Sequence, residues 1–142
     1  MRIVKSSSRT KQIVAGLISG FVLGLFLKAA EAFTGAKVYI LLLNVDYVPF
    51  LNRLVLPEAV EFGIHLLISI IVSTALGSRR RSKEFYIIAG MVIGIVLYPT
   101  TLLSDRTPGL LDFQAIFYWL VGHGIYGYTL SIFNAKNKHQ AA

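Results

Sequence analysis

The fold is decided by residues 58–77, which read EAVEFGIHLLISIIVSTALG. The last sixteen of these residues carry no formal charge, with His65 counted as neutral. Polar side chains recur at steps of three or four residues, which places them on one face of an α-helix: Glu58, Glu61, His65, Ser69 and Ser73. A polar stripe on a membrane helix is costly unless it faces protein or water. The segment therefore predicts a membrane helix whose polar face points into the protein.

The composition of the whole chain is that of a membrane protein. Of its 142 residues, 55% are hydrophobic and only 15% are charged, whereas a soluble domain carries about 25% charged residues. Four apolar blocks recur, at residues 13–27, 62–77, 85–103 and 113–133. A helix needs about twenty apolar residues to cross a bilayer. We therefore expect one all-α domain over residues 1–142, with four transmembrane helices at about 11–33, 58–77, 85–103 and 113–133.

The net charge of +7 is distributed in a way that indicates a membrane topology and argues against a nucleic-acid partner. Ten basic residues flank the expected helices on one side: Arg2, Lys5, Arg9, Lys11, Arg79, Arg80, Arg81, Lys83, Lys136 and Lys138. The other side holds Lys28, Lys37, Arg53 and Arg106. Because Lys and Arg are enriched in cytoplasmic loops, both termini are predicted to be cytoplasmic. The cluster at residues 79–83 is either this topology signal alone or also a site for anionic lipid head groups.

The N-terminal block has a second interpretation. A basic start, an apolar core and Ala30-Glu31-Ala32 are also features of a cleavable signal peptide. Glycines spaced by four residues in the same block favour a helix that stays in the membrane and packs closely against another. The expected close-packing positions along the chain are Gly16, Gly20, Gly24, Gly90, Gly94, Gly122, Gly124 and Gly127. These faces also suggest a homo-oligomer or a second membrane protein as partner, in addition to the lipid bilayer.

The connection over residues 35–57 is long and contains the apolar run VYILLL at 38–43. Six residues are too few to cross a membrane. We expect this run to lie in the membrane interface or to re-enter the helix bundle, as an anchor or as a lid. Further along, Pro99 removes a backbone donor and should kink or end its helix.

Ionisable side chains at membrane depth predict one outward-facing polar pocket. Its expected members are Lys28, Glu31, Glu58, Glu61, His65, Ser69 and His123. Lys28 and Glu31 lie one helical turn apart and are expected to pair. His65 and His123 are the candidate ligands for a metal or a haem, although two imidazoles fall short of a usual zinc set. We therefore expect no cofactor by default.

Three function classes fit such a pocket. The first is a membrane protein that responds to protons, ions or a small ligand, since histidine titrates near neutral pH. The second is a structural or assembly factor that packs with partner helices, and the third is a protein that binds metal or haem through histidine. An enzyme is not expected, because the chain has no nucleophile elbow, His-Glu-x-x-His motif or phosphate loop, and contains no cysteine.

An ordered set of short motifs resembles the YagU-type family of small four-helix proteins of the bacterial inner membrane. The matching residues are Lys28 and Glu31, His65 and Ser69, Tyr98-Pro99, Thr107-Pro108 and Gly122-His123. The resemblance implies a multi-pass protein of the bacterial cytoplasmic membrane, without established biochemistry. The family pattern has glutamates where this chain has Trp119 and Ile132, so its reputed link to acid tolerance does not transfer directly.

Overall fold

The computed structural model describes residues 2–136, with side chains from residue 8 onward. It is 76% helical and has no strand in the described part. The elements are α1 (Arg2–Thr34), α2 (Val38–Leu43), the 3-10 helix η1 (Leu51–Arg53), α3 (Glu58–Leu76), α4 (Lys83–Leu97), the 3-10 helix η2 (Tyr98–Leu103) and α5 (Phe113–Asn134). The prediction of an all-α fold is confirmed. The α1 helix begins well before the expected residue 11, and Lys138 lies outside the described residues.

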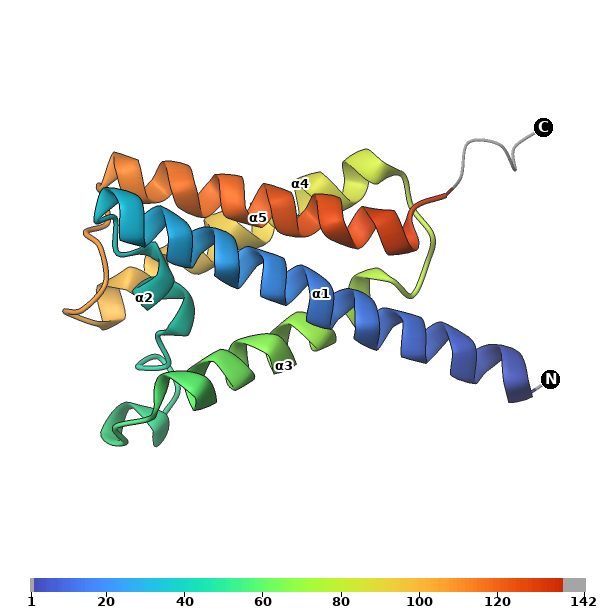
Figure 1. Ribbon diagram of the computed structural model, residues 1–142, viewed down its shortest axis with the longest axis horizontal. Coiled ribbons are helices and arrows are strands. Elements are labelled where there is room, and N and C mark those ends of the chain that lie inside the picture. The colour runs from blue at the N-terminus through green and yellow to red at the C-terminus, as the bar shows by residue number, and fades with distance from the viewer. Residues whose placement is uncertain (1, 137–142) are drawn as a thin grey trace.

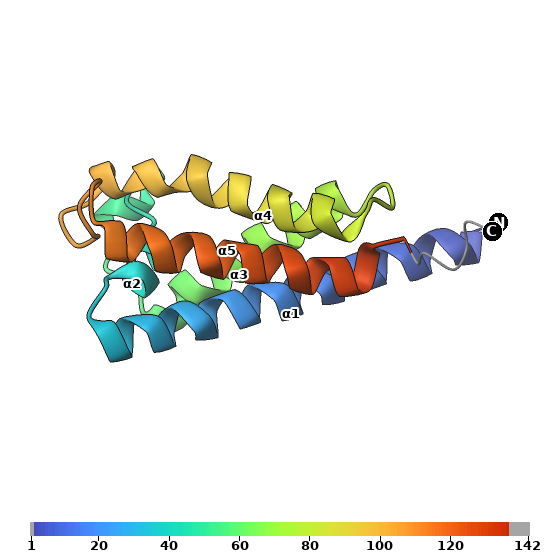
Figure 2. The ribbon, with the colours of Figure 1, turned by 90° about the horizontal axis from the view of Figure 1, so that it is seen from above.

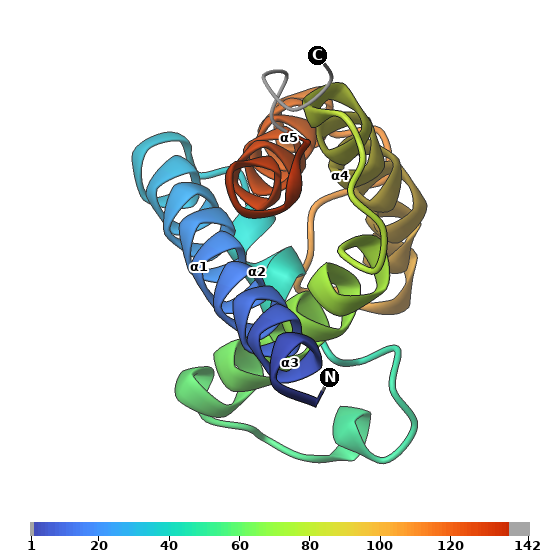
Figure 3. The ribbon, with the colours of Figure 1, turned by 90° about the vertical axis from the view of Figure 1, so that its right-hand side faces the viewer.

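The four long helices run along a common direction and are arranged around a centre (Figures 1 and 3). The α1 helix packs against both α3 and α5, and α4 packs against α5. The start of α1, the α3–α4 connection and the end of α5 lie toward one end, the terminal end (Figure 2). Lys136 donates its backbone N–H to the carbonyl of Arg81 there, at 3.0 Å. The opposite end, which holds α2 and the α4–α5 connection, is called the loop end.

Three helical segments in the described part are long and apolar enough to cross a membrane: Ser8–Thr34, Glu58–Leu76 and Lys83–Leu103. The expectation of four such helices is wrong by this measure, because α5 is not among them. Gln114, His123 and several tyrosines and glycines lower its hydropathy. The reason is its position: α5 packs between α1 and α4. A helix whose neighbours are protein need not be apolar on every face.

The α4 helix ends where proline requires it to end. It stops at Leu97, and the chain continues as η2 with Pro99 in its first turn. The hydroxyl of Thr100 donates to the carbonyl of Leu97 at 2.8 Å, which satisfies one of the acceptors at the break. The prediction of a break at Pro99 agrees with this geometry.

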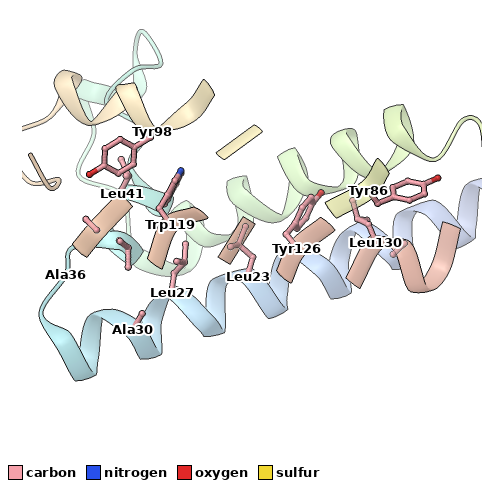
Figure 4. Close-up of a cluster of buried hydrophobic side chains, with 13 residues drawn as sticks. Leu23, Leu27, Ala30, Ala36, Leu41, Tyr86, Tyr98, Trp119, Tyr126 and Leu130 are labelled. Carbon is pink, nitrogen blue, oxygen red and sulfur yellow. The ribbon is translucent and has the colours of Figure 1, made fainter. Parts of the chain in front are cut away.

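Large aromatic side chains form much of the core. Tyr98, Trp119, Tyr126 and Tyr86 lie in a row along the bundle, with Leu23 and Leu27 of α1 against them (Figure 4). Their polar atoms are bonded to backbone carbonyls, as when Tyr98 donates to Gly109 at 3.0 Å. A buried aromatic ring with a satisfied polar end contributes area to the core without an orphaned donor.

The predicted glycine faces lie inside the bundle but have different partners. A Cβ atom built on Gly90 would meet the backbone of His123 and Gly127 on α5, and one built on Gly16 would meet the backbone of α3 at Ile70. Gly122 faces Leu23 and Leu27 of α1, whereas Gly124 has only ordinary contact with Met91. The close approaches are therefore α1 to α3, α4 to α5 and α5 to α1.

Candidate functional site

The polar stripe of α3 faces α1 and is hydrogen-bonded to its backbone. His65 Nε2 donates to the carbonyl of Gly20 at 3.0 Å and Ser69 Oγ to that of Gly16 at 2.6 Å. Ser73 Oγ donates to the carbonyl of Gln12 at 2.8 Å. Each step of four residues along α3 matches a step of four back along α1, as an antiparallel pair requires. We call these three bonds the α1–α3 ladder.

Two features of the sequence make the ladder possible. Gly16 and Gly20 lack side chains, so α3 approaches the α1 backbone closely enough for a serine hydroxyl to reach a carbonyl. At the terminal end, Gln12 Nε2 of α1 donates a hydrogen bond to the carbonyl of Gly77, the residue that follows α3, at 2.8 Å. Much of the predicted stripe is therefore used in holding two helices together.

At the loop end, the ion pair differs from the expected one. Lys28 Nζ lies 2.6 Å from Glu58 Oε1 and pairs with it across two helices, not with Glu31. Glu31 Oε2 instead accepts the backbone N–H groups of Tyr39 and Ile40, at 2.8 and 3.0 Å. These are first-turn donors of α2, whose preceding residue Lys37 provides no side-chain cap. Glu31 thus holds α2 in place by satisfying donors that have no partner within a helix.

Tyr39 completes this outer cluster. Its hydroxyl donates to Glu58 Oε1 at 2.8 Å, and Lys28 Nζ lies 5.0 Å from the centre of its ring. Burial, followed by the hydrogen bond to Glu58 and the nearby carboxylates, raises the pKa of Tyr39 to about 12. The hydroxyl therefore stays protonated and remains a donor across the ordinary pH range.

A cavity of about 100 Å³ lies between the helices. Polar side chains from two helices line it, namely Glu61, His65 and Ser69 of α3 and His123 and Tyr126 of α5. Asn44, which directly follows α2, also lines it. The rest of the lining is mostly aliphatic, with contributions from α1, α2 and α4 as well. Residues that lie far apart in the sequence thus share one small space.

His123 is held in this lining by a hydrogen bond to Trp119, whose own ring is hydrogen-bonded to α4. Its Nδ1 donates to the carbonyl of Trp119 at 2.9 Å, and Trp119 Nε1 donates in turn to the carbonyl of Gly94 at 2.8 Å. The two rings lie 4.4 Å apart between centres. Because a carbonyl can only accept, Nδ1 carries the proton and Nε2 keeps a lone pair. By the same argument, His65 donates through Nε2 and keeps a lone pair on Nδ1.

Asn44 is the functional candidate that the sequence interpretation missed. It is 3% exposed, and its Oδ1 accepts the backbone N–H of Asp46 at 3.2 Å. Its Nδ2 atom is buried and has no hydrogen-bond partner in the described part of the chain. In the sequence, Asn44 stands in the long connection between two helices, where an asparagine is typical of a turn. The available signal was an amide placed directly after a run of six apolar residues.

A hollow of about 220 Å³ at the loop end shares two lining residues with the cavity. Asn44 and Glu61 line both spaces, and Glu58 and Arg106 line the hollow. Asp46 pairs with Arg106 at 3.5 Å. We call Asn44 and Glu61 the mouth of the cavity.

The predicted pocket residues are therefore only partly brought together. Glu61, His65, Ser69 and His123 line one cavity, and Glu58 lies just outside its mouth. Lys28 lines a separate hollow with Glu58 and Phe62, and Glu31 is bonded to α2. Among the described residues, no group of three or more His, Cys, Asp or Glu side chains could hold a metal ion. His65 and His123 remain a two-ligand candidate.

No family model, curated protein or solved structure matches this chain. The resemblance to the YagU-type proteins therefore stays a prediction, and function is inferred below from the geometry of the site.

Proposed function

We propose that this chain is an integral membrane protein that binds a small molecule in the cavity between its helices. The observation that carries the proposal is the unpartnered Nδ2 of Asn44, a residue of the cavity lining. A buried donor without a partner costs about 1–3 kcal/mol. A polar ligand in the cavity would recover that cost by accepting a hydrogen bond.

The lining suits a small ligand that is partly polar. His65 and His123 each keep one ring nitrogen free as an acceptor, because the other nitrogen donates to a carbonyl. Aliphatic side chains such as Ile64, Ile93 and Leu97 surround these groups. Binding sites for small molecules commonly combine an apolar wall with a few placed polar groups.

The charge pattern supports an orientation for the proposed protein. The basic residues at positions 79–83 and Lys136 lie at the terminal end. We place that end in the cytoplasm by the positive-inside rule, so that the mouth faces the opposite side of the membrane. The proposed location is the bacterial cytoplasmic membrane, as the YagU-type resemblance implies.

A second candidate is a structural or assembly factor, and the α1–α3 ladder favours it. The ladder uses His65, Ser69 and Ser73 to join two helices and requires no ligand. Apolar side chains on α3 and α4 remain exposed, including Ile71 and Val96. In a bilayer these faces meet lipid, a second copy or another membrane protein.

A cavity-filling variant distinguishes the two candidates. Ile93 lines the cavity, whereas Ile95 on the same helix is 57% exposed on its outer face. We expect a set of small polar compounds to contain members that raise the melting temperature of the wild-type protein and of the control Ile95→Phe. The same compounds should leave the melting temperature of Ile93→Phe unchanged, because the larger side chain fills the cavity. If no compound stabilises the wild type, or if Ile93→Phe responds equally, the structural role is favoured.

A further inference from the structure

We propose that the ligand of the cavity is a small primary ammonium ion that also carries a hydrogen-bond acceptor such as a hydroxyl group. This inference rests on the proposed function and names its ligand class. Three independent features of the lining and the mouth point to it: an uncompensated charge, a set of acceptors and one orphaned donor.

The first feature is the charge at the mouth. Two of the nearby acids have basic partners, since Glu58 pairs with Lys28 and Asp46 pairs with Arg106. Glu61 has no ion-pair partner in the part of the chain that the structure describes. A carboxylate at the edge of an apolar cavity is costly unless a cation lies near it. The mouth therefore favours a positively charged ligand over a neutral or negative one.

The second feature is the number of acceptors on the residues that line the cavity. His65 Nδ1 and His123 Nε2 keep lone pairs, because the opposite nitrogen of each ring donates to a carbonyl. A primary ammonium group has three N–H donors and no acceptor. It can satisfy these nitrogens and the Glu61 carboxylate in a way that a quaternary ammonium cannot. The rings of Trp119 and Tyr126 also line the cavity, and aromatic faces attract cations.

The third feature is the orphaned donor. Asn44 Nδ2 requires an acceptor, and an ammonium group has none. A hydroxyl group on the same ligand would accept this bond. The volume of about 100 Å³ limits the ligand to a few non-hydrogen atoms, since a water molecule takes a share of about 30 Å³ in the liquid. An amino alcohol of two carbons has the required groups within that size.

The same chemistry is available from two sources. One is a free amino alcohol, and the other is the ethanolamine head group of a phospholipid, which would reach the mouth from the loop end. In the head group the hydroxyl is esterified to phosphate, so the ester and phosphate oxygens would be the acceptors. The class of ligand is the same in both cases, so the test is designed around ethanolamine. Nanodiscs that contain phosphatidylethanolamine or phosphatidylcholine then separate the sources.

The test uses the full chain, with binding measured by calorimetry and by the shift in melting temperature. The probes are ethanolamine, ethylene glycol as its neutral counterpart, ethylamine as the same cation without the hydroxyl, and choline as a cation without N–H donors. We expect ethanolamine to bind at least about tenfold more tightly than each of the others, the difference expected from one lost charged or buried hydrogen bond.

Two variants and one control assign the contacts. Glu61→Gln should weaken ethanolamine binding by about tenfold or more, whereas Asp105→Asn, an exposed acid at the same end, should leave it unchanged. Asn44→Leu should abolish the preference for ethanolamine over ethylamine. If a variant does not fold, the probe series on the wild type still decides the question. A lipid source is indicated when added ethanolamine stabilises the protein in phosphatidylcholine nanodiscs but not in phosphatidylethanolamine nanodiscs.

Two results would overturn the inference. Equal affinity for ethylene glycol and ethanolamine would exclude the charge requirement, and unchanged binding in Glu61→Gln would exclude its assigned partner. Failure of this inference can be distinguished from failure of the proposed function. If a neutral or anionic compound binds the wild type and is blocked by Ile93→Phe, the cavity binds a ligand but the ammonium class is wrong.

Discussion

Ser69 on α3 donates its hydroxyl proton to the backbone carbonyl of Gly16 on α1, at 2.6 Å. The two residues are 53 positions apart in the sequence. Tyr126 of α5 donates to the Ser69 carbonyl at 3.1 Å, so the same residue connects three helices. A serine inside a membrane helix thus acts here as an interhelical contact, and its cost in the bilayer is offset by a specific partner.

We expect each serine hydroxyl of the α1–α3 ladder to make a measurable contribution to the stability of the protein. Ser73→Ala removes the donor to the Gln12 carbonyl, and Ser69→Ala removes the donor to Gly16. We expect each change to lower the free energy of unfolding by about 0.5–1.5 kcal/mol, the range for interhelical hydrogen bonds in membranes. Reversible unfolding in mixed detergent micelles measures this. The matched control is Thr74→Ala, whose hydroxyl bonds only to Ile70 of its own helix. An equal loss in the control would contradict the role assigned to the ladder.

Glycine positions should divide into sensitive and tolerant ones. A methyl group at Gly90 would meet the backbone of α5, and backbone cannot move without separating the helices. We expect Gly90→Ala to destabilise the protein by about 1–3 kcal/mol, as overpacking does. A methyl group at Gly63 would have no neighbouring atom within 4 Å, so Gly63→Ala should be neutral or stabilising by up to about 1 kcal/mol. Melting temperatures of the two variants in one detergent decide the comparison.

The outer cluster predicts a pH dependence at high pH. The pKa of Tyr39 is raised to about 12 in the folded protein, from an ordinary value of 10.0. The folded state therefore holds this proton more tightly than the unfolded state does. The stability associated with it is complete below pH 10 and is lost as pH rises through about 12. Titration of phenolate absorbance, as the difference between the wild type and Tyr39→Phe, measures the value.

Replacing the partner of Tyr39 tests the cause of that shift. Burial is the largest cause, and the hydrogen bond to Glu58 is the next. In Glu58→Gln, the pKa of Tyr39 should fall toward its ordinary value but remain above it, because burial is unchanged. A pKa that does not move in this variant would show that the carboxylate contributes nothing.

The proposed orientation can be tested directly because the chain has no cysteine. A single cysteine at Asp105 marks the loop end, and one at Arg80 marks the terminal end. In intact cells, a thiol reagent that does not cross membranes should label Asp105→Cys and not Arg80→Cys. Labelling of both after lysis is the control. The reverse pattern in intact cells would invert the orientation and place the mouth in the cytoplasm.

Local chemistry was sufficient to predict several features of this protein. The apolar blocks predicted the long helices, and α3 spans Glu58–Leu76 against an expected 58–77. Pro99 indicated the end of α4, since a proline ring constrains the chain wherever it lies. The four-residue spacing of Glu61, His65 and Ser69 predicted that they share a face. These features depend on residues that are close together in the chain.

Partners between distant residues were decided only by the tertiary structure. Lys28 has two acids within reach in principle, and which of them it meets depends on how α1 packs against α3. Glu31 is bonded to the start of α2 because the chain turns back after α1, which its helical spacing from Lys28 does not indicate. The packing of α5 between α1 and α4 likewise emerged only from the structure, and it explains why this helix need not be apolar on every side. Asn44 became a candidate only when α2 placed it at the cavity, since an unsatisfied donor is defined by everything that surrounds it.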